Sequence, residues 1–233
     1  MATVDEQPSP ANDRYFGNKT EDILAAAEAV WAERGYRATS MTDLAQAAGL
    51  SKPGLYHYVT SKEQLLVLLY QTVMEQHLVE ERAVIDSSTS AAESLRRILA
   101  QRAAYSCRQQ KLWRIFTEEE AEVPAELMGV IRQQRRERED FLVKVVEEGV
   151  AAGEFRLTAT PRIAVRSMVG AVNFCYKWFD PTGPKDADQI GSEVAAFLVS
   201  ALVPEKKARA PRGSAATGST GGKTRRGGRP ASD

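Results

Sequence analysis

The sequence predicts an all-α fold of about nine helices. Apolar residues recur at helical spacing between residues 18 and 203, and glycines and capping residues separate the apolar segments. No stretch shows the alternation that is typical of a strand. Hydrophobic residues make up 43% and charged residues 27% of the 233 positions, which is ordinary for a globular chain that can bury a core.

The first helix is expected to begin at residue 18, after a flexible arm at 1–17 that lacks apolar periodicity. Glu21 and Asp22 suit the positive end of a helix, and Gly35 is a typical helix stop. The apolar stripe of this helix consists of Ile23, Leu24, Ala27, Val30 and Trp31.

Two short helices follow. Ser40-Met41-Thr42-Asp43 resembles a capping box with Asp at its last position, and Gly49 ends that helix. Ser51 can cap the next one, which tolerates Pro53 because first-turn amides have no partner within the helix. Two short helices joined by a turn that contains Gly predict a helix-turn-helix. Residues 18–63 are therefore expected to form a three-helix DNA-binding domain.

The remaining helices predict a larger domain over 64–203. Expected segments are 61–80, 90–106, 111–121, 124–152, 161–179 and 186–203, and Ser90-Ala91-Ala92-Glu93 reads as a second capping box. Residues 204–233 lose their large apolar side chains and carry eight Lys or Arg against two acids, a net charge of +6. This composition predicts a disordered basic tail, which either adds nonspecific affinity for DNA or has no measurable role.

The stretch from Trp31 to Leu66 resembles the TetR family DNA-binding domain. The likeness includes Gly35-Tyr36, Leu44-Ala45, Ala48-Gly49, Leu55-Tyr56 and Ser61-Lys62-Glu63. These positions spread over three helices and both turns. The resemblance implies a transcriptional regulator that binds operator DNA as a homodimer and is usually a repressor.

The second short helix is expected to enter a DNA major groove with its N-terminus first. Lys52 can donate to guanine, and Gly54 lets the backbone come close. The resemblance implies phosphate contacts by Thr42, Tyr56, His57 and Lys62. The full set of expected DNA-binding residues is Ser40, Thr42, Ser51, Lys52, Pro53, Gly54, Tyr56, His57 and Lys62.

The C-terminal half resembles TetR members that control lipid, sterol or aromatic-acid breakdown, several of which respond to acyl-CoA thioesters. The likeness lies in Arg135–Phe141, Gly149–Phe155 and Gly170–Gly183. It implies a small-molecule effector, and no cofactor is expected. An acyl chain needs an apolar tunnel, and CoA phosphates need arginines. The expected ligand-binding residues are Leu112, Trp113, Phe116, Phe141, Val145, Met168, Val172, Cys175, Arg135, Arg138 and Arg166.

The resemblance also implies that two copies pair through their last two helices. Apolar stripes on the helices at 161–179 and 186–203 are candidates for this contact, although such stripes also build cores. The expected dimer-interface residues are Val165, Val169, Val194, Leu198 and Leu202.

Other function classes find little support in the sequence. Cys107 and Cys175 are isolated, which indicates no disulfide framework or metal site and favours a reducing cytoplasm. No nucleophile–base pairing or phosphate-binding loop indicates an enzyme, and no apolar run approaches the roughly 20 residues of a membrane span. A multidrug-sensing repressor remains an alternative because of Glu118–Glu122, and so does a structural DNA-binding protein without a ligand.

Overall fold

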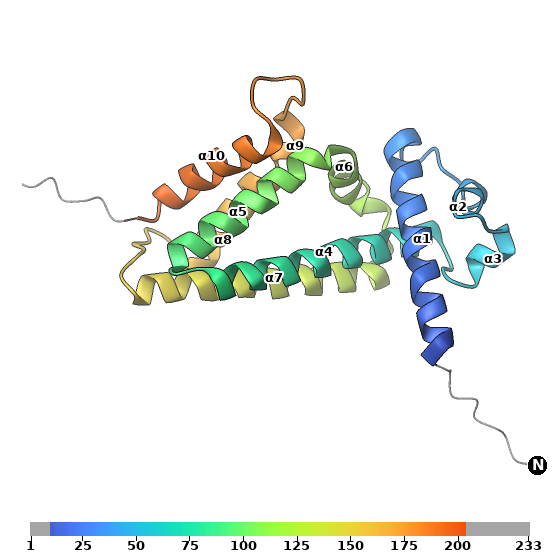
Figure 1. Cartoon of the computed structure of the whole chain (residues 1–233), viewed down its shortest axis with the longest axis horizontal. Helices are drawn as coiled ribbons and strands as arrows, with labels where there is room; N and C mark the ends of the chain where they lie inside the picture. Colours follow the sequence, from blue (N-terminus) through green and yellow to red (C-terminus); the bar gives the residue numbers. More distant parts are fainter. Residues whose placement is uncertain (1–9, 204–233) are drawn as a thin grey trace, which may run out of the picture.

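The computed structural model describes residues 10–203, and this part of the chain is helical without a strand. Figure 1 shows a small head, α1 to α3, beside a larger body that holds the other elements. The elements are α1 (Pro10–Arg34), α2 (Met41–Ala47), α3 (Lys52–Tyr56), α4 (Lys62–Ser87), α5 (Ala91–Arg108), α6 (Gln110–Glu118), the 3-10 turn η1 (Glu120–Glu122), α7 (Ala125–Ala151), α8 (Pro161–Asn173), α9 (Cys175–Trp178) and α10 (Ala187–Ser200).

The first helix begins earlier than the sequence predicted. It starts at Pro10, inside the segment expected to be an arm. Proline fits the first turn of a helix, and a single interior glycine such as Gly17 costs only about 1 kcal/mol, so neither residue prevents a helix there. The rest of the predicted arm, 1–9, and the predicted basic tail, 204–233, lie outside the described residues.

Serine caps set the starts of α2 and α3 in the head. Ser40 Oγ accepts the amide of Asp43 at 3.2 Å, and the Asp43 carboxylate accepts the Ser40 amide at 2.8 Å, which confirms the first capping box. The second differs from the prediction. Ser90 caps α5, but the carboxylate of Glu93 accepts the amide and hydroxyl of Thr89 instead of the Ser90 amide.

The helix predicted over 161–179 is divided at Phe174 into α8 and α9. The carbonyl of Asn173 accepts the indole N–H of Trp113 at 2.8 Å, and a contact from α6 therefore occupies a carbonyl that would otherwise continue the helix. If α8 and α9 are counted together, the described residues contain the nine α-helices that were expected.

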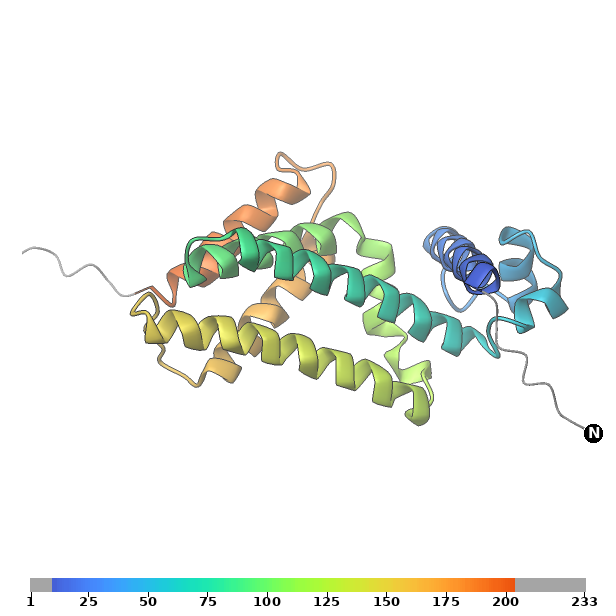
Figure 2. The same ribbon diagram turned by 60° about the horizontal axis from the view of Figure 1, so that its bottom comes forward.

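Long helices tie the head to the body. α4 leaves the head and runs along α7, and the two lie side by side in Figures 1 and 2. On the other side of the body α10 packs along α5. Gly191 permits this close approach, since a Cβ there would lie 2.5 Å from the carbonyl oxygen of Ala100.

Two hydrophobic clusters form the core. One joins the head to the first half of α4, to α6 and to the start of α7. The other joins α5, the second half of α7, α8 and α10. The boundary between the two clusters therefore runs through the body, between the head and the far end of the molecule.

Candidate DNA-binding surface and ligand cavity

The turn between α2 and α3 has the geometry of a helix-turn-helix. Gly49 adopts φ +66°, a left-handed conformation that favours glycine. Its amide donates to the carbonyl of Gln46 at 3.1 Å, and that of Leu50 to the carbonyl of Ala45 at 2.8 Å. These two bonds form a Schellman motif, which ends α2 and redirects the chain into α3.

Packing holds α3 with one face outward. Leu55 is fully buried and Val59 nearly so, while Ser51, Lys52 and Pro53 at the start of the helix are exposed. The Ser51 hydroxyl accepts the amide of Gly54 at 3.1 Å and fixes the first turn. This leaves the N-terminal end of α3 open to a major groove about 12 Å wide.

Most of the expected DNA-binding residues are exposed. Gly54 and Lys62 are half-buried. The exposed ones are Ser40, Thr42, Ser51, Lys52, Pro53, Tyr56 and His57. Lys62 also has an internal role, because its ammonium donates to the carbonyls of Tyr36 and Thr39 at 3.0 and 3.1 Å. It thereby ties the loop before α2 to the start of α4.

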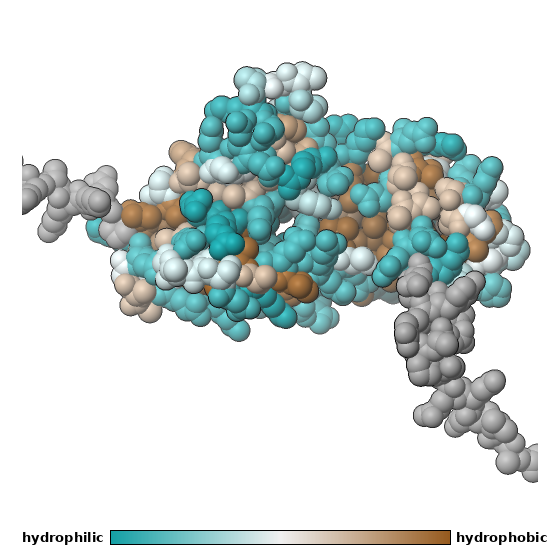
Figure 3. All heavy atoms as spheres, viewed as in Figure 1, coloured by the Kyte–Doolittle hydropathy of each residue, from teal (hydrophilic) through white to brown (hydrophobic). Residues whose placement is uncertain are grey.

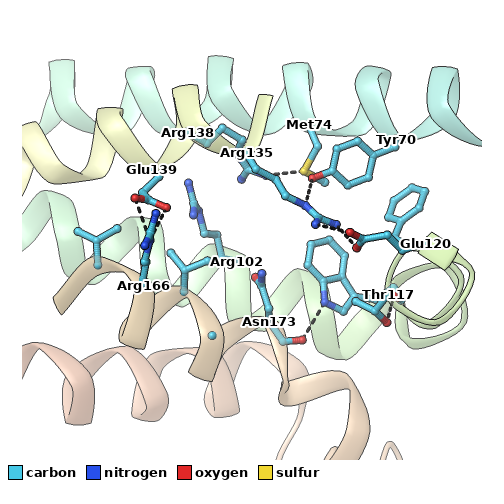
Figure 4. A pocket seen from close by; sticks show the side chains of 15 residues that line it. Tyr70, Met74, Arg102, Thr117, Glu120, Arg135, Arg138, Glu139, Arg166 and Asn173 are labelled. Carbon is cyan, nitrogen blue, oxygen red and sulfur yellow. Dashed lines mark hydrogen bonds and ion pairs between the residues drawn. The ribbon is translucent and has the colours of Figure 1, made fainter. Parts of the chain in front are cut away.

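A cavity of about 510 Å³ lies in the body where the two core clusters meet (Figure 4). Five helices and η1 contribute to its wall. The lining residues are Tyr70, Met74, Arg102, Trp113, Phe116, Thr117, Glu120, Arg135, Arg138, Glu139, Val165, Arg166, Val169, Gly170 and Asn173.

Aromatic rings form one wall of the cavity. Tyr70 and Phe116 meet edge to face with centroids 5.1 Å apart, and Trp113 and Phe116 with centroids 6.2 Å apart. The indole bond of Trp113 to Asn173 fixes the tryptophan in place. Such a rigid apolar surface suits a hydrocarbon group.

Paired arginines also line the cavity, and Arg135 donates to the hydroxyl of Tyr70 at 3.3 Å. Arg135 donates twice to the Glu120 carboxylate, at 3.0 and 2.7 Å, and Arg166 donates to Glu139 at 3.0 and 3.1 Å. Each guanidinium is planar and can form two parallel hydrogen bonds to an anion. Phosphate oxygens could therefore bind at these arginines.

Deeper in the body, Glu81 lies between two arginines. Arg102 donates twice to its carboxylate at 2.7 Å, and Arg138 donates once at 2.9 Å. Burial alone would raise the pKa of Glu81. The two positive charges outweigh burial and hold this pKa below its ordinary value, so the carboxylate is ionised.

The structure places the expected ligand-binding residues in two groups. Trp113, Phe116, Arg135, Arg138 and Arg166 line the cavity. The others do not. Leu112 is buried in the first core cluster. The other five pack within or against the second core cluster: Phe141, Val145, Met168, Val172 and Cys175.

Sequence reasoning missed Arg102, although a signal was present. It lies on the apolar stripe of α5 that includes Leu95, Ile98 and Leu99, all fully buried. A lone arginine on an inward-facing stripe indicates either a buried ion pair or a binding site.

The expected dimer-interface residues face inward within the protomer. Val165 and Val169 line the cavity, Leu202 is buried, and Val194 and Leu198 are half-buried against the second core cluster. The exposed large apolar residues of the same segments are Ile163, Phe174, Trp178, Phe197 and Val203. In Figure 3 hydrophobic residues reach the surface at the end of the body away from the head, where α10 ends.

An acidic segment, Glu118–Glu122, connects the cavity with the head. Arg37, in the loop before α2, contacts Glu119 at 2.9 Å and Glu122 at 3.0 Å. Between these two acids, Glu120 holds Arg135 at the cavity. The same few residues thus touch both the DNA-binding head and the wall of the cavity.

The described residues offer no support for two other kinds of site. Within 10–203 no group of three or more His, Cys, Asp or Glu side chains is placed to hold a metal ion. No helix in this range is both long and apolar enough to cross a membrane.

Known proteins resemble the chain over most of its length. The HTH-type transcriptional repressor KstR2 of Mycolicibacterium smegmatis is 25% identical over 197 residues, which cover 83% of this chain and 95% of that protein. The fatty acid metabolism regulator protein of Bacillus subtilis is 23% identical over 185 residues, 79% of this chain and 95% of that protein. A crystal structure of AibR with isovaleryl coenzyme A and operator DNA has a TM-score of 0.67 at 26% identity, and covers 78% of this chain and 97% of that chain.

Two family models match consecutive parts of the chain. Residues 88–202 match the model described as "Tetracyclin repressor-like, C-terminal domain". Residues 23–69 match the model described as "Bacterial regulatory proteins, tetR family". These matches confirm the expected fold class, a regulator that is not an enzyme, and a cytoplasmic location. The chain belongs to the tetR family of transcriptional regulators.

Proposed function

We propose that the protein is a repressor that binds a palindromic operator as a homodimer and leaves it when an acyl-CoA thioester enters the cavity. The observation that carries this proposal is the composition of the cavity wall. A rigid aromatic side accepts an acyl group, and the arginines Arg135 and Arg166 of the same cavity can bind phosphate oxygens.

The relatives support this ligand class. AibR has been crystallised with isovaleryl coenzyme A and operator DNA together. The Bacillus subtilis relative is a regulator of fatty acid metabolism, and KstR2 is a ketosteroid regulator. A thioester of CoA is a chemical form that the degradation of fatty and steroid acids can share.

The two alternative functions fit the cavity less well. A repressor that senses cationic drugs needs carboxylates free to bind them. The cavity lining instead has four arginines against two carboxylates, Glu120 and Glu139, so its net charge favours an anion over a cation. A structural DNA-binding protein without a ligand would have no use for a cavity of about 510 Å³ lined by both aromatic and charged groups.

The homodimer follows from how such a head reads DNA. One α3 reaches one major groove, and a palindromic operator presents two grooves about 34–36 Å apart. Two copies must therefore be joined at a fixed spacing. The exposed apolar residues on α8, α9 and α10 provide a surface for this contact.

Release of DNA requires that a structural change at the cavity alters the DNA-binding head. A phosphate that competes for Arg135 would loosen its contact with Glu120 and allow the acidic segment to move. Since Arg37 is held by the same segment, the orientation of the head would change with it. A ligand that favours this second arrangement shifts the population away from the DNA-binding state.

Fluorescence anisotropy tests the proposal. Purified full-length protein is titrated onto labelled DNA from upstream of its own gene, and acyl-CoA thioesters and cationic drugs are then added. We expect tight binding that one class of thioester reverses at micromolar concentration. Release by drugs alone would reject the ligand class, and no binding to this DNA or to DNA selected from a random pool would reject the operator-binding repressor.

A further inference from the structure

A buried charge cluster lies at the inner wall of the cavity, and we call its three residues, Glu81, Arg102 and Arg138, the deep cluster. They come from α4, α5 and α7, which are separate elements brought together by the fold. Arg102 and Arg138 line the cavity, and Glu81 lies behind them. Figure 4 shows these two arginines extending from different helices toward the same region of the cavity.

The deep cluster differs from the other arginines of the cavity by its burial. The side chains of Arg102 and Arg138 are 8% and 12% exposed. Those of Arg135 and Arg166 are 42% and 60% exposed. Two arginines of the cavity, Arg135 and Arg166, therefore meet solvent, and we call them the outer arginines, while Arg102 and Arg138 are nearly buried.

The deep cluster has one positive charge in excess, since two guanidiniums share a single carboxylate. His77 does not change this balance. Burial and the positive charge of Arg138 lower the pKa of His77 to about 4, so its ring is neutral at pH 7. Glu139 is already neutralised by Arg162 and Arg166. An uncompensated charge is costly inside a protein, and proteins normally pair it.

Arg138 also has donors that lack a strong acceptor. Its Nε has no hydrogen-bond partner among the described residues. Its Nη1 contacts the sulfur of Met74, which is a weak acceptor. One oxygen of Glu81 is thus the strong acceptor that Arg138 reaches. Excess charge and unused donors occur on the same buried side chain.

We propose that the deep cluster binds a carboxylate, and that the effector is a CoA thioester whose acyl part ends in a second acid group. This inference rests on the proposed function and specifies its ligand as the mono-CoA thioester of a dicarboxylic acid. A carboxylate bound at Arg138 makes the cluster neutral and accepts hydrogen bonds from the unused N–H groups of Arg138. A neutral carbonyl would accept a donor but leave the charge.

The rest of the cavity fits the remainder of such a molecule. The apolar residues of the wall, Trp113, Phe116 and Val169, can pack against the carbon chain. The more exposed arginines, Arg135 and Arg166, can contact the phosphates of CoA. The two charged ends of the ligand are then bound by two different pairs of arginines.

Isothermal titration calorimetry on the full-length protein tests the proposal with matched ligands. One series contains succinyl-, adipoyl-, suberoyl- and dodecanedioyl-CoA, and the other contains butyryl-, hexanoyl-, octanoyl- and dodecanoyl-CoA. Each pair has the same number of carbons and differs in a terminal carboxylate or methyl group. At the chain length that binds best, we expect the diacid thioester to bind about tenfold more tightly or better, as a buried charge-assisted hydrogen bond would give.

Arg138→Met separates the deep cluster from the outer arginines. It leaves the bidentate Glu81–Arg102 pair intact and neutral, and thermal unfolding monitors whether the fold is kept. In this variant we expect the diacid and monoacid thioesters of a pair to bind with affinities within about twofold of each other. The affinity for the monoacid thioester should be nearly unchanged. The control Arg166→Met, at one of the outer arginines, should weaken both ligands by a similar factor and leave the preference intact.

The outcomes distinguish this inference from the proposed function. Tighter or equal binding of the methyl-terminated series overturns the carboxylate site and leaves the acyl-CoA repressor in place. Equal loss of both series in Arg138→Met assigns Arg138 to the CoA phosphates and also overturns the inference. Failure of both series to bind rejects the proposed ligand class itself. The comparison on the unmodified chain requires no variant to fold.

Discussion

His77 shows at the scale of one residue how the deep cluster affects its surroundings. Burial and Arg138 lower the pKa of this histidine to about 4, compared with 6.5 for an ordinary one. Between these two pH values the unfolded chain binds a proton that the folded chain does not. The free energy of unfolding therefore decreases as the pH falls from 6.5 to 4, and the contribution of His77 is constant below that range.

We expect His77→Phe to remove this pH dependence while keeping an aromatic ring against Tyr105, whose centroid lies 4.1 Å from that of His77. The slope of the free energy of unfolding against pH should decrease by up to about 1.4 kcal/mol per pH unit. Urea unfolding between pH 4.5 and 7 measures it. The sequence contains one other histidine, and His57→Gln, on the exposed face of α3, is the control that should keep the slope. An unchanged slope in His77→Phe would show that His77 takes up its proton at the same pH in the folded and the unfolded chain.

At the scale of helices, the sequence predicts features that depend on neighbouring residues, and it does not predict features that depend on contacts between helices. The caps at Ser40 and Ser51 depend on residues within one turn, so the sequence predicted them. The break at Phe174 depends on Trp113, 61 residues away along the chain, and no local pattern predicts it. α8 is apolar on more than one side, and its sequence does not say which side faces the cavity, the core or the surface.

The acidic segment is the element to which we assign the coupling between cavity and head. We expect the double variant Glu119→Gln with Glu122→Gln to bind acyl-CoA in solution with unchanged affinity but to release DNA less readily. Its contacts with Arg37 would be weakened, while Glu120 would still hold Arg135. Couplings of this kind are typically 5- to 150-fold, and we expect the effect of ligand on DNA affinity to fall by about threefold or more.

Calorimetry without DNA and anisotropy with DNA measure the two affinities separately. Glu126→Gln, an exposed change at the start of α7, is the matched control and should leave both unchanged. Full release of the double variant at the wild-type ligand concentration would exclude the acidic segment as the connection.

At the scale of the whole molecule, the cavity lies between the two core clusters. One core contains the head, and the other contains α8 and α10, whose outer surfaces we assign to the dimer. A ligand between them can change the angle between the head and the dimer contact without unfolding either core. In a dimer, a small change of this angle in each copy alters the distance between the two α3 helices, on which binding to a palindrome depends.

The dimer surface can be tested at Phe197 on α10, which is 77% exposed and therefore contributes little to the fold of one protomer. We expect Phe197→Glu to shift the protein toward monomer in sedimentation velocity and to weaken operator binding by about tenfold or more, because a charge would be buried at the interface and a monomer reaches one half-site. Circular dichroism should show unchanged helix content.

Val79→Glu is the matched control, since Val79 is 67% exposed on α4 and the chemical change is the same. It should leave the dimer and the operator affinity intact. If Phe197→Glu remains a dimer while Val79→Glu dissociates, the contact lies on α4. In that case the exposed apolar residues of α8 and α10 do not form the dimer contact, and the cavity does not set the spacing of the two heads through these helices.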